Sequence, residues 1–306
     1  MGQKECINNK SCAIITIIVN LIKCIVRINM KGKLKTILTC MLLAGCIGAG
    51  YTYMTKQSNK DFSESKKVFE EDSIQYYGYH CLNDREKEVY LYINDCVKNM
   101  DSKTSIPKEA TEEEISNASE MVRTDHPEYF WYDGSGKYNG VQGFNGTPFQ
   151  LWYYPEYNIE KSQKEETQQQ IDDEVENIKL QIPSNATPKE IVEKLYQAVC
   201  NEAVYNKEAS NNQNIKSVFV NHETVCAGYA KSMQYLLRQY DIPCIYVRGV
   251  HETESHAWNR VYVDGVWYWV DPTAKNSMFC LFDDNFLASQ HYQIDKNYAK
   301  GALEGY

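Results

Sequence analysis

The chain is short of positive charge. Its 306 residues include 32 Lys and Arg against 41 Asp and Glu, which gives a formal net charge of −9 at pH 7. Outside the first 55 residues there is no cluster of basic residues, which is the electrostatic feature that a nucleic-acid-binding surface needs. We therefore expect no nucleic acid among the partners of this protein.

Patterns that bind metal are also missing. The chain has 11 cysteines and 6 histidines, but no Cys-x-x-Cys pair and no Cys/His spacing of the kind that binds zinc. There is no Asp/Asn-rich loop resembling an EF-hand, and there is no internal repeat. We therefore expect neither a metal nor another cofactor.

The cysteines do not suggest a disulfide scaffold. Five lie in the first 55 residues, at Cys6, Cys12, Cys24, Cys40 and Cys46. The other six are Cys81, Cys96, Cys200, Cys226, Cys244 and Cys280. Since setting Cys226 aside as a candidate nucleophile leaves an odd number, we expect mostly buried thiols with at most one or two disulfides.

No long uninterrupted apolar run is present. Residues 13–26 are apolar but are interrupted by Asn20 and Lys23, and the run is too short to span a bilayer comfortably. A second signal follows, with a basic segment at Met30–Lys35 and an apolar segment at Thr36–Gly45. Residues 1–55 thus form a leader or anchor, with Met1 or Met30 as the start.

The end of this leader offers a lipidation site. Leu43-Ala-Gly-Cys46 resembles the bacterial lipoprotein box, in which Cys46 would carry the lipid and become the mature N-terminus. The alternative is an uncleaved anchor, because residues 47–54 remain fairly apolar. Both interpretations place the protein outside the cytoplasm and attached to the membrane. A cytoplasmic protein is the third alternative.

Residues 56–182 predict a helix-rich α+β region. Capping boxes and apolar periodicity predict helices over residues 84–98 and 112–125, and a charged, Gln-rich stretch at 160–179 predicts an exposed helix. Aromatic segments at 129–133 and 149–154 predict two strands separated by a Gly-rich stretch. These strands form either a carbohydrate-binding surface or the core of this region.

Residues 183–306 carry the candidate chemistry. After a helix predicted over residues 188–202, apolar residues recur at helical spacing from Cys226 to Tyr240. With Thr224 as the N-cap, Cys226 lies in the first turn. Free amides and the helix dipole favour a thiolate there and offer donors for an oxyanion. The small Gly228 would allow other backbone to approach the helix closely.

A β-hairpin then places two more polar side chains. A strand is predicted at 244–248, and strands at 257–263 and 266–270 flank the turn residues Asp264-Gly265. With this two-residue loop, Trp258 lies opposite Asp271, and His256 is the diagonal neighbour of Asp271 on the same face. Diagonal neighbours are about 7–8 Å apart, within reach of a His–carboxylate hydrogen bond. The three residues have the types of a nucleophile, a base and the group that orients the base.

The segments around these residues resemble a known superfamily. Cys226-Ala-Gly-Tyr-Ala230, His256-Ala-Trp258 and Val270-Asp-Pro-Thr273 are similar to the core of the transglutaminase-like superfamily, a papain-like fold found in transglutaminases, microbial cysteine proteases and many bacterial surface proteins. The resemblance covers about residues 187–275. It implies Cys226 as nucleophile, His256 as general base and acid, and Asp271 as the orienting group. Many bacterial members have Cys-Glu-Gly, where this chain has Ala227.

Together these observations predict an α+β protein with a papain-like transglutaminase core, in which the nucleophile helix packs on an antiparallel sheet. The expected function is an extracytoplasmic thiol acyl-transfer enzyme that acts on peptide or carboxamide bonds, most simply by hydrolysis. Its partner is a protein or peptide substrate, with cell-wall peptide as one candidate. The alternatives are a cross-linking transglutaminase and a non-catalytic surface-binding module. Trp258 and Trp269 either wall the site or serve only the core.

Overall fold

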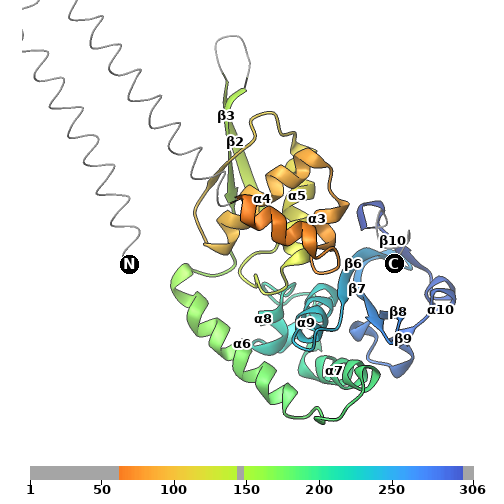
Figure 1. Ribbon diagram of the computed structural model, residues 1–306. Helices are drawn as coiled ribbons and strands as arrows, with labels where there is room; N and C mark the ends of the chain where they lie inside the picture. Colours follow the sequence, from red (N-terminus) through yellow and green to blue (C-terminus); the bar gives the residue numbers. More distant parts are fainter. Residues whose placement is uncertain (1–61, 143–147, 299–306) are drawn as a thin grey trace, which may run out of the picture. The chain divides into compact units, whose positions relative to one another are not determined.

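The computed structural model describes residues 62–142 and 148–298 (Figure 1). By its internal contacts the chain divides into residues 1–66 and residues 67–306, and the fold described below belongs to the second unit. The predicted leader, with Cys46, lies outside the described residues. Within the described residues, no helix has the length and apolar character needed to cross a membrane.

The N-terminal region, residues 67–155, is built from helices and a small antiparallel sheet with strand order β1-β3-β2. Its elements are α3 (Tyr77–Cys81), α4 (Asp84–Lys98), β1 (Thr104–Ile106), α5 (Glu112–Asp125), β2 (Gly136–Gln142) and β3 (Pro148–Pro155). The capping boxes at Asn83 and Thr111 are both formed, so the two predicted helices are confirmed. Each box satisfies amides that the first helical turn leaves without partners.

One predicted strand of this region is wrong. Tyr129–Asp133 forms a buried turn after α5, in which the amide of Tyr132 donates to the carbonyl of Tyr129 at 2.9 Å. The Trp131 indole N–H donates to the Val97 carbonyl, also at 2.9 Å, and this bond ties the turn to α4. All four aromatic side chains are buried because they fill the core instead of alternating between two faces.

The strand that pairs with β3 comes from the Gly-rich stretch instead. β2 spans Gly136–Gln142, within the segment that was predicted only to separate two strands, whereas the strand predicted at 149–154 is confirmed as β3. Tyr153 of β3 is buried, and its hydroxyl lies 2.8 Å from that of Tyr132 and 3.0 Å from Ser119 Oγ. This buried network supports the core interpretation of the aromatic segments over a carbohydrate-binding surface.

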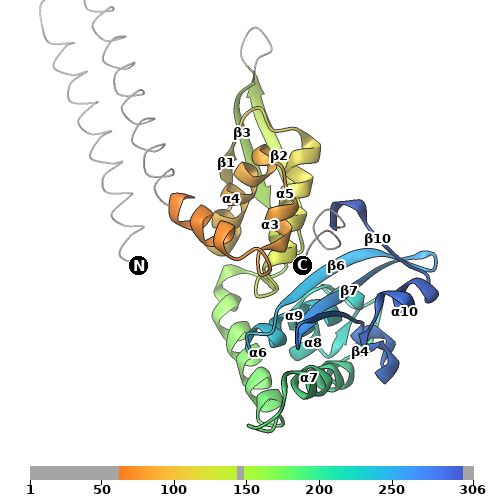
Figure 2. The same ribbon diagram turned by 45° about the vertical axis from the view of Figure 1, so that its right-hand side comes forward.

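The C-terminal region, residues 161–298, contains a five-stranded antiparallel sheet of order β10-β6-β7-β8-β9 (Figure 2). Its helices are η1 (Lys161–Gln163), α6 (Lys164–Lys179), α7 (Pro188–Glu202), α8 (Ile215–Phe219), α9 (Cys226–Arg238), η2 (Pro272–Ala274), η3 (Ser277–Phe279) and α10 (Asp284–Ser289). Its strands are β4 (Val204–Tyr205), β5 (Glu223–Thr224), β6 (Cys244–His251), β7 (Glu254–Val263), β8 (Val266–Val270), β9 (Cys280–Phe282) and β10 (Tyr292–Ile294). The protein is α+β, as predicted.

Helix α9, which begins at the candidate nucleophile Cys226, lies against the sheet. It contacts β6 and β7 on one side and α7 and α8 on another, and its side chains from Ala227 to Leu237 are almost all buried. The capping box at Thr187 is formed, which confirms the predicted start of α7. Helix α6 is also confirmed, but it is not wholly exposed. Its buried face consists of Thr167, Ile171, Val175 and Ile178.

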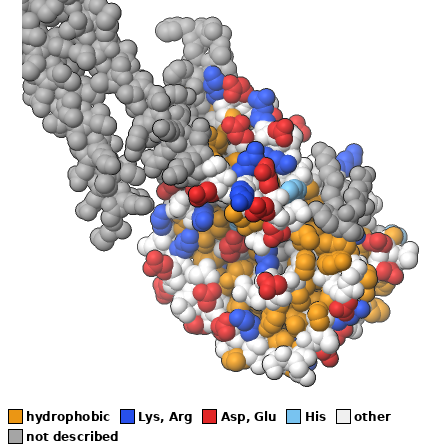
Figure 3. Space-filling view, in the orientation of Figure 1, with side chains coloured by type: hydrophobic (Ala, Val, Ile, Leu, Met, Phe, Trp, Pro, Cys, Tyr) orange, Lys and Arg blue, Asp and Glu red, His pale blue; other side chains and the backbone are white. Residues whose placement is uncertain are grey.

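The two regions are joined by charged and polar contacts. Arg248 of β6 forms an ion pair with Glu120 of α5 at 2.7 Å, and the Arg123 guanidinium donates to the Tyr246 hydroxyl at 3.2 Å. Figure 3 shows charged side chains of both signs over the N-terminal region and more hydrophobic side chains over the sheet of the C-terminal region. By their internal contacts, residues 67–306 form one compact unit. This division does not test the domain boundary predicted between residues 182 and 183, which stays a prediction.

Candidate active site

The first residue of α9 is Cys226, so the predicted nucleophile does lie in the first helical turn. The predicted N-cap is wrong, however. Val225 holds the N-cap position, while Thr224 belongs to β5 and pairs there with Tyr205. The Thr224 hydroxyl donates to the Asn212 carbonyl at 2.9 Å and lies 2.6 Å from Ser217 Oγ. It is already bonded to this loop and does not cap the helix.

Close packing around the first turn of α9 depends on Gly228. A Cβ atom at this position would lie 1.9 Å from Thr224 Oγ1 and 2.7 Å from Ser217 Oγ. Both distances are far shorter than a van der Waals contact. The predicted close approach is therefore present. It holds the strand that precedes Cys226 against the helix that Cys226 begins.

The hairpin has the predicted register. Val263 pairs with Val266 and Arg260 with Trp269 across the turn at Asp264-Gly265. The ladder ends at Asn259 and Val270, one residue before Asp271, because Asp271 turns away to begin η2. His256 and Asp271 nevertheless remain close neighbours, as the diagonal pairing predicts.

Asp271 is held by three donors. Its Oδ2 accepts a hydrogen bond from His256 Nε2 at 2.7 Å and another from the Tyr292 hydroxyl at 2.6 Å. Its Oδ1 accepts from the backbone amide of Thr273 at 2.9 Å. Asp271 is fully buried and His256 nearly so. A buried carboxylate with this many donors has one orientation, and it fixes the orientation of the imidazole in turn.

The electrostatics of the site favour an imidazolium. Burial lowers the pKa of His256, but hydrogen bonds with Asp271 and Cys226 and the charges of the same two groups outweigh it and raise this pKa to about 10. Burial raises the pKa of Asp271, yet the His256 hydrogen bond and charge, with help from Tyr292, bring it below its ordinary value. The raised pKa of His256 and the lowered pKa of Asp271 both favour an imidazolium–carboxylate pair.

Two amides next to the thiol are unused. Among the described residues, the backbone N–H groups of Cys226 and Ala227 have no hydrogen-bond partner, whereas the amides of Gly228 and Tyr229 donate to the Val225 carbonyl. Free amides at a helix N-terminus attract negative charge. They are available to a developing oxyanion on a carbonyl attacked by Cys226.

Trp258 and Trp269 are core residues that also border the site. Both are fully buried, with ring centroids 6.4 Å apart. The Trp258 ring stacks on the His256 imidazole at 5.9 Å, and the Trp269 indole N–H donates to Asp284 at 2.6 Å. Trp258 therefore forms one wall of the His256 environment, while Trp269 anchors the start of α10.

Sequence reasoning missed several residues that support Asp271. Tyr292 comes from β10, and the Tyr196 hydroxyl of α7 donates to the backbone carbonyl of Asp271 at 3.2 Å. The His251 ring stacks on Tyr292 at 4.1 Å and lies 5.4 Å from the ring of His256. Tyr292 lies outside the segments that carried the resemblance, and no local pattern marks it among 24 tyrosines.

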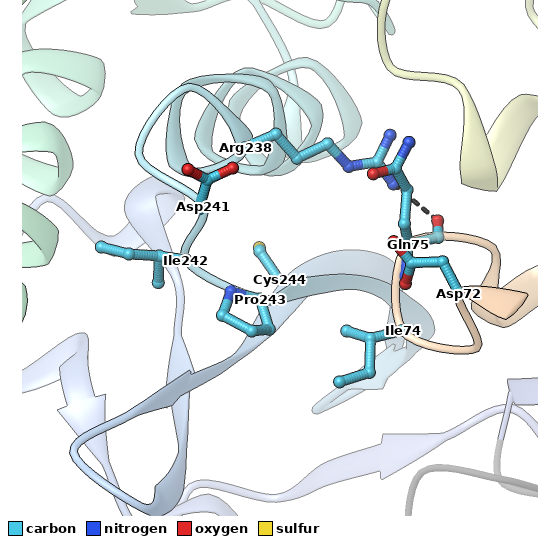
Figure 4. Close-up of a pocket in the computed structure, with 8 residues that line it drawn as sticks. All are labelled: Asp72, Ile74, Gln75, Arg238, Asp241, Ile242, Pro243 and Cys244. Carbon is cyan, nitrogen blue, oxygen red and sulfur yellow. Dashed lines mark hydrogen bonds between the residues drawn. The ribbon is translucent and has the colours of Figure 1, made fainter.

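A cavity between the N-terminal and C-terminal regions contains none of the three candidate residues. It has a volume of about 260 Å³ and is lined by Asp72, Ile74, Gln75, Arg238, Asp241, Ile242, Pro243 and Cys244 (Figure 4). Burial raises the pKa of the Cys244 thiol to about 12, so this cysteine stays protonated at neutral pH. No cluster of three metal-ligating side chains occurs within residues 62–142 and 148–298.

Comparisons with known proteins found a matching family model and similar solved structures. Residues 176–272 match the family model of the transglutaminase-like superfamily. A crystal structure of a TGase is similar with a TM-score of 0.32 and 17% identity over 46% of this chain and 44% of the other. A candidate cysteine protease from Cytophaga hutchinsonii is similar with a TM-score of 0.29 and 16% identity over 45% of this chain and 62% of the other.

The match of this chain to both solved structures is partial, since it covers less than two thirds of either one. No curated protein sequence matches the chain. The family match contains helix α9, the hairpin and the start of η2. Residues 176–272 are therefore similar to the transglutaminase-like superfamily, and they lie in a fold of helices and antiparallel sheets.

Proposed function

We propose that this protein is a thiol acyl-transfer enzyme that hydrolyses peptide or carboxamide bonds through a thioester on Cys226. The observation that carries the proposal is the 2.7 Å hydrogen bond between His256 Nε2 and buried Asp271, on an imidazole whose pKa Asp271 and Cys226 both raise. Thiol catalysis of this kind needs a thiol, an imidazole that takes its proton, and a third group that orients the imidazole.

The reaction follows from the positions of the groups. Proton transfer from the Cys226 thiol to His256 gives a thiolate and an imidazolium, which Asp271 stabilises. The thiolate attacks the substrate carbonyl, and the negative charge that forms on its oxygen is met by the free amides of Cys226 and Ala227. The imidazolium then protonates the leaving amine, and the C–N bond breaks to leave a thioester. Water, deprotonated by His256, attacks the thioester and regenerates the thiol.

The test of this function is the reactivity of Cys226. The full chain is treated with iodoacetamide across the range from pH 4 to pH 10, and the alkylated peptides are identified by mass. A thiolate paired with His256 should alkylate well below pH 8, with an acid limb below the value of about 8.5 for a free thiol. A Cys226 whose rate rises only through pH 8–9 forms no ion pair, and the protein is then a surface-binding module that keeps the residues without the chemistry.

Hydrolysis and cross-linking differ in the acceptor. We favour water, because no second substrate is needed for it to reach the thioester. A fluorogenic amide library is incubated with the protein in the presence and absence of a primary amine. Release of the free acid supports a protease or amidohydrolase. Accumulation of the amine adduct in preference to the acid would make it a transglutaminase.

We further propose that the enzyme acts outside the cytoplasm, attached to the membrane through residues 1–55, with lipid on Cys46. The support is the sequence Leu43-Ala-Gly-Cys46 after a basic and an apolar segment. Metabolic labelling with a fatty-acid analogue in a bacterial host should label the wild type but not Cys46→Ala. An unlabelled protein that retains the peptide 30–45 would identify an uncleaved anchor instead.

A further inference from the structure

Asp271 receives a second side-chain donor that lies outside the matched domain. The hydroxyl of Tyr292 donates to Asp271 Oδ2 at 2.6 Å, and this is the same oxygen that accepts from His256 at 2.7 Å. Tyr292 belongs to β10, 20 residues beyond the end of the family match at residue 272. This contact is buried, so water does not compete for the shared oxygen.

We propose that Tyr292 is a positioning residue of the site, whose hydroxyl holds the Asp271 carboxylate in the orientation that the His256 imidazole requires. This inference rests on the proposed function for its effect on catalysis. Its geometric part, the restraint of His256 through Asp271, stands on the hydrogen bonds alone.

The Tyr292 ring is itself aimed by its neighbours. It stacks on His251 at 4.1 Å with an interplanar angle of 15°, and it meets Trp258 edge-on at 5.0 Å. β10 pairs with β6 in a register that sets Tyr292 opposite His251, so the stack follows from the backbone ladder. Because the Tyr292 ring is packed on two sides, its hydroxyl group is held in one position. It also lies 5.9 Å from the His256 ring and limits the approach of water.

The segment that carries Tyr292 is anchored at its far end. The Tyr298 hydroxyl lies 2.9 Å from Thr124 Oγ1 and donates to Glu120 Oε1 at 2.8 Å, both on α5. Tyr298 is fully buried and has no contact with Asp271 among the described residues. It is therefore a matched control: a second buried tyrosine of the same segment, bonded to a carboxylate that takes no part in the proposed chemistry.

Several titratable groups lie around Asp271 and Tyr292. Their surroundings must be the same in the wild type and in a Tyr292 variant for the two proteins to be compared. These groups are His256 on β7, Cys226 on α9, His251 on β6, Tyr196 and Cys200 on α7, and Tyr205 on β4. Burial, and then the charge of Asp271, raises the pKa of Tyr292, so the phenol keeps its proton and acts as a donor. Replacing its hydroxyl alone leaves the other groups in place.

The expected effect has a definite sign. Without Tyr292 the carboxylate loses a donor and rotates more freely, so it supports the imidazolium less well. The thiolate–imidazolium pair should then form at a higher pH and lose its imidazolium proton at a lower pH. The acid limb of Cys226 alkylation therefore moves up by about one pH unit, which corresponds to a tenfold change.

The experiment compares Tyr292→Phe with Tyr298→Phe in the full chain. Each variant loses one phenol–carboxylate bond, and Tyr298→Phe also loses the contact with Thr124, so thermal unfolding should show a loss of stability in both. Iodoacetamide alkylation of Cys226 against pH should show the raised acid limb only in Tyr292→Phe. Equal profiles in Tyr292→Phe and the wild type, or the same raised acid limb in Tyr298→Phe, would overturn the proposal.

A second measurement separates this inference from the proposed function. The imidazole of His256 is titrated by NMR in the wild type and in Tyr292→Phe. The pKa of His256 is about 10 in the wild type, and it should be lower in Tyr292→Phe. If wild-type Cys226 alkylates as an ordinary thiol, the proposed function fails, but a fall in the His256 pKa still supports the positioning role. An unchanged His256 pKa overturns that role whatever the thiol does.

Discussion

Asp125 in the N-terminal region and Asp271 in the C-terminal region are both carboxylates with almost no exposed surface, and their pKa values are shifted in opposite directions. Asp125 and Asp271 are both fully buried, and each accepts a tyrosine hydroxyl, from Tyr90 at 2.9 Å and from Tyr292 at 2.6 Å. Yet burial raises the pKa of Asp125 to about 6, while the pKa of Asp271 is lowered. The deciding difference is the imidazole hydrogen-bonded to Asp271.

The other partners of Asp125 are neutral. The amides of Gly78 and Tyr79 donate to its two oxygens at 2.6 Å and 2.8 Å, which fixes the start of α3 against α5. The charge of His126 opposes the effect of burial but does not overcome it. Neutral donors satisfy a buried carboxylate, whereas a bonded cation keeps it ionised. The neutral donors around Asp125 stabilise the fold, whereas the ion pair of Asp271 with His256 is suited to catalysis.

Removing the thiol should have the largest effect. Cys226→Ala should abolish turnover completely, because no other group near His256 can form the thioester, and it should leave the melting temperature almost unchanged. Cys244→Ala is the control, since that thiol is buried and protonated. Activity assays and thermal unfolding of both variants check this prediction. Retained turnover in Cys226→Ala would contradict the mechanism.

The two carboxylates can be compared directly by amide substitution. Asp271→Asn should lower the rate by about 10²–10⁴, by analogy with the loss of the orienting carboxylate in serine triads. Asp125→Asn should keep the wild-type rate, because Asp125 contacts none of the three residues. Rates of thioester formation measured under single turnover decide between them. Equal losses of rate in the two variants would show that Asp271 has no special role in thioester formation.

Gly228 and Gly78 allow the two regions to be compared by their packing. A Cβ at Gly228 would lie 1.9 Å from Thr224 Oγ1, and a Cβ at Gly78 would lie 2.8 Å from Asp125 Oδ1. Each Gly→Ala change should destabilise the fold, by about 1–3 kcal/mol. Only Gly228→Ala should also slow the alkylation of Cys226, since it displaces the strand before the nucleophile. Slower alkylation in Gly78→Ala would show that the N-terminal region controls the site.

The smallest effect is on the dependence of stability on pH, and its sign differs between the two buried carboxylates, Asp125 and Asp271. The pKa of Asp125 lies above the unfolded value of about 3.9, so the unfolded state releases this proton first, and stability falls as pH rises from about 4 to 6. The slope is at most about 1.4 kcal/mol per pH unit for one proton. Urea unfolding of the wild type and Asp125→Asn should differ by this slope in that window.

The two groups of the His256–Asp271 pair contribute in opposite senses to each other, and only Asp271 is opposite to Asp125. The raised pKa of His256 means that its stabilisation is complete below the unfolded value of about 6.5 and is lost as pH rises through about 10. The lowered pKa of Asp271 means that its contribution is present above the unfolded value of about 3.9 and is lost in acid. His256→Gln should therefore flatten the alkaline decline, which pH-dependent unfolding measures. An unchanged decline would place the titrating group elsewhere.

The sequence determined the elements whose signals are local. Capping boxes set the starts of α4, α5 and α7, and the Asp264-Gly265 turn set the hairpin register that makes His256 and Asp271 neighbours. A two-residue turn leaves the register little freedom, because a one-residue slip would move every side chain to the other face. The association of these two residues was therefore readable before the fold was known.

Only the tertiary structure decided the rest. Tyr129–Asp133 has the composition of a strand, but packing against α4 makes it a buried turn. Thr224 has the chemistry of an N-cap, but its hydroxyl is already bonded to Ser217 and Asn212. Tyr292 reaches Asp271 from 21 residues away, through a strand pairing that no local pattern encodes. Hydrogen-bond partners distant in sequence compete with local preferences, and burial gives the distant partners the advantage.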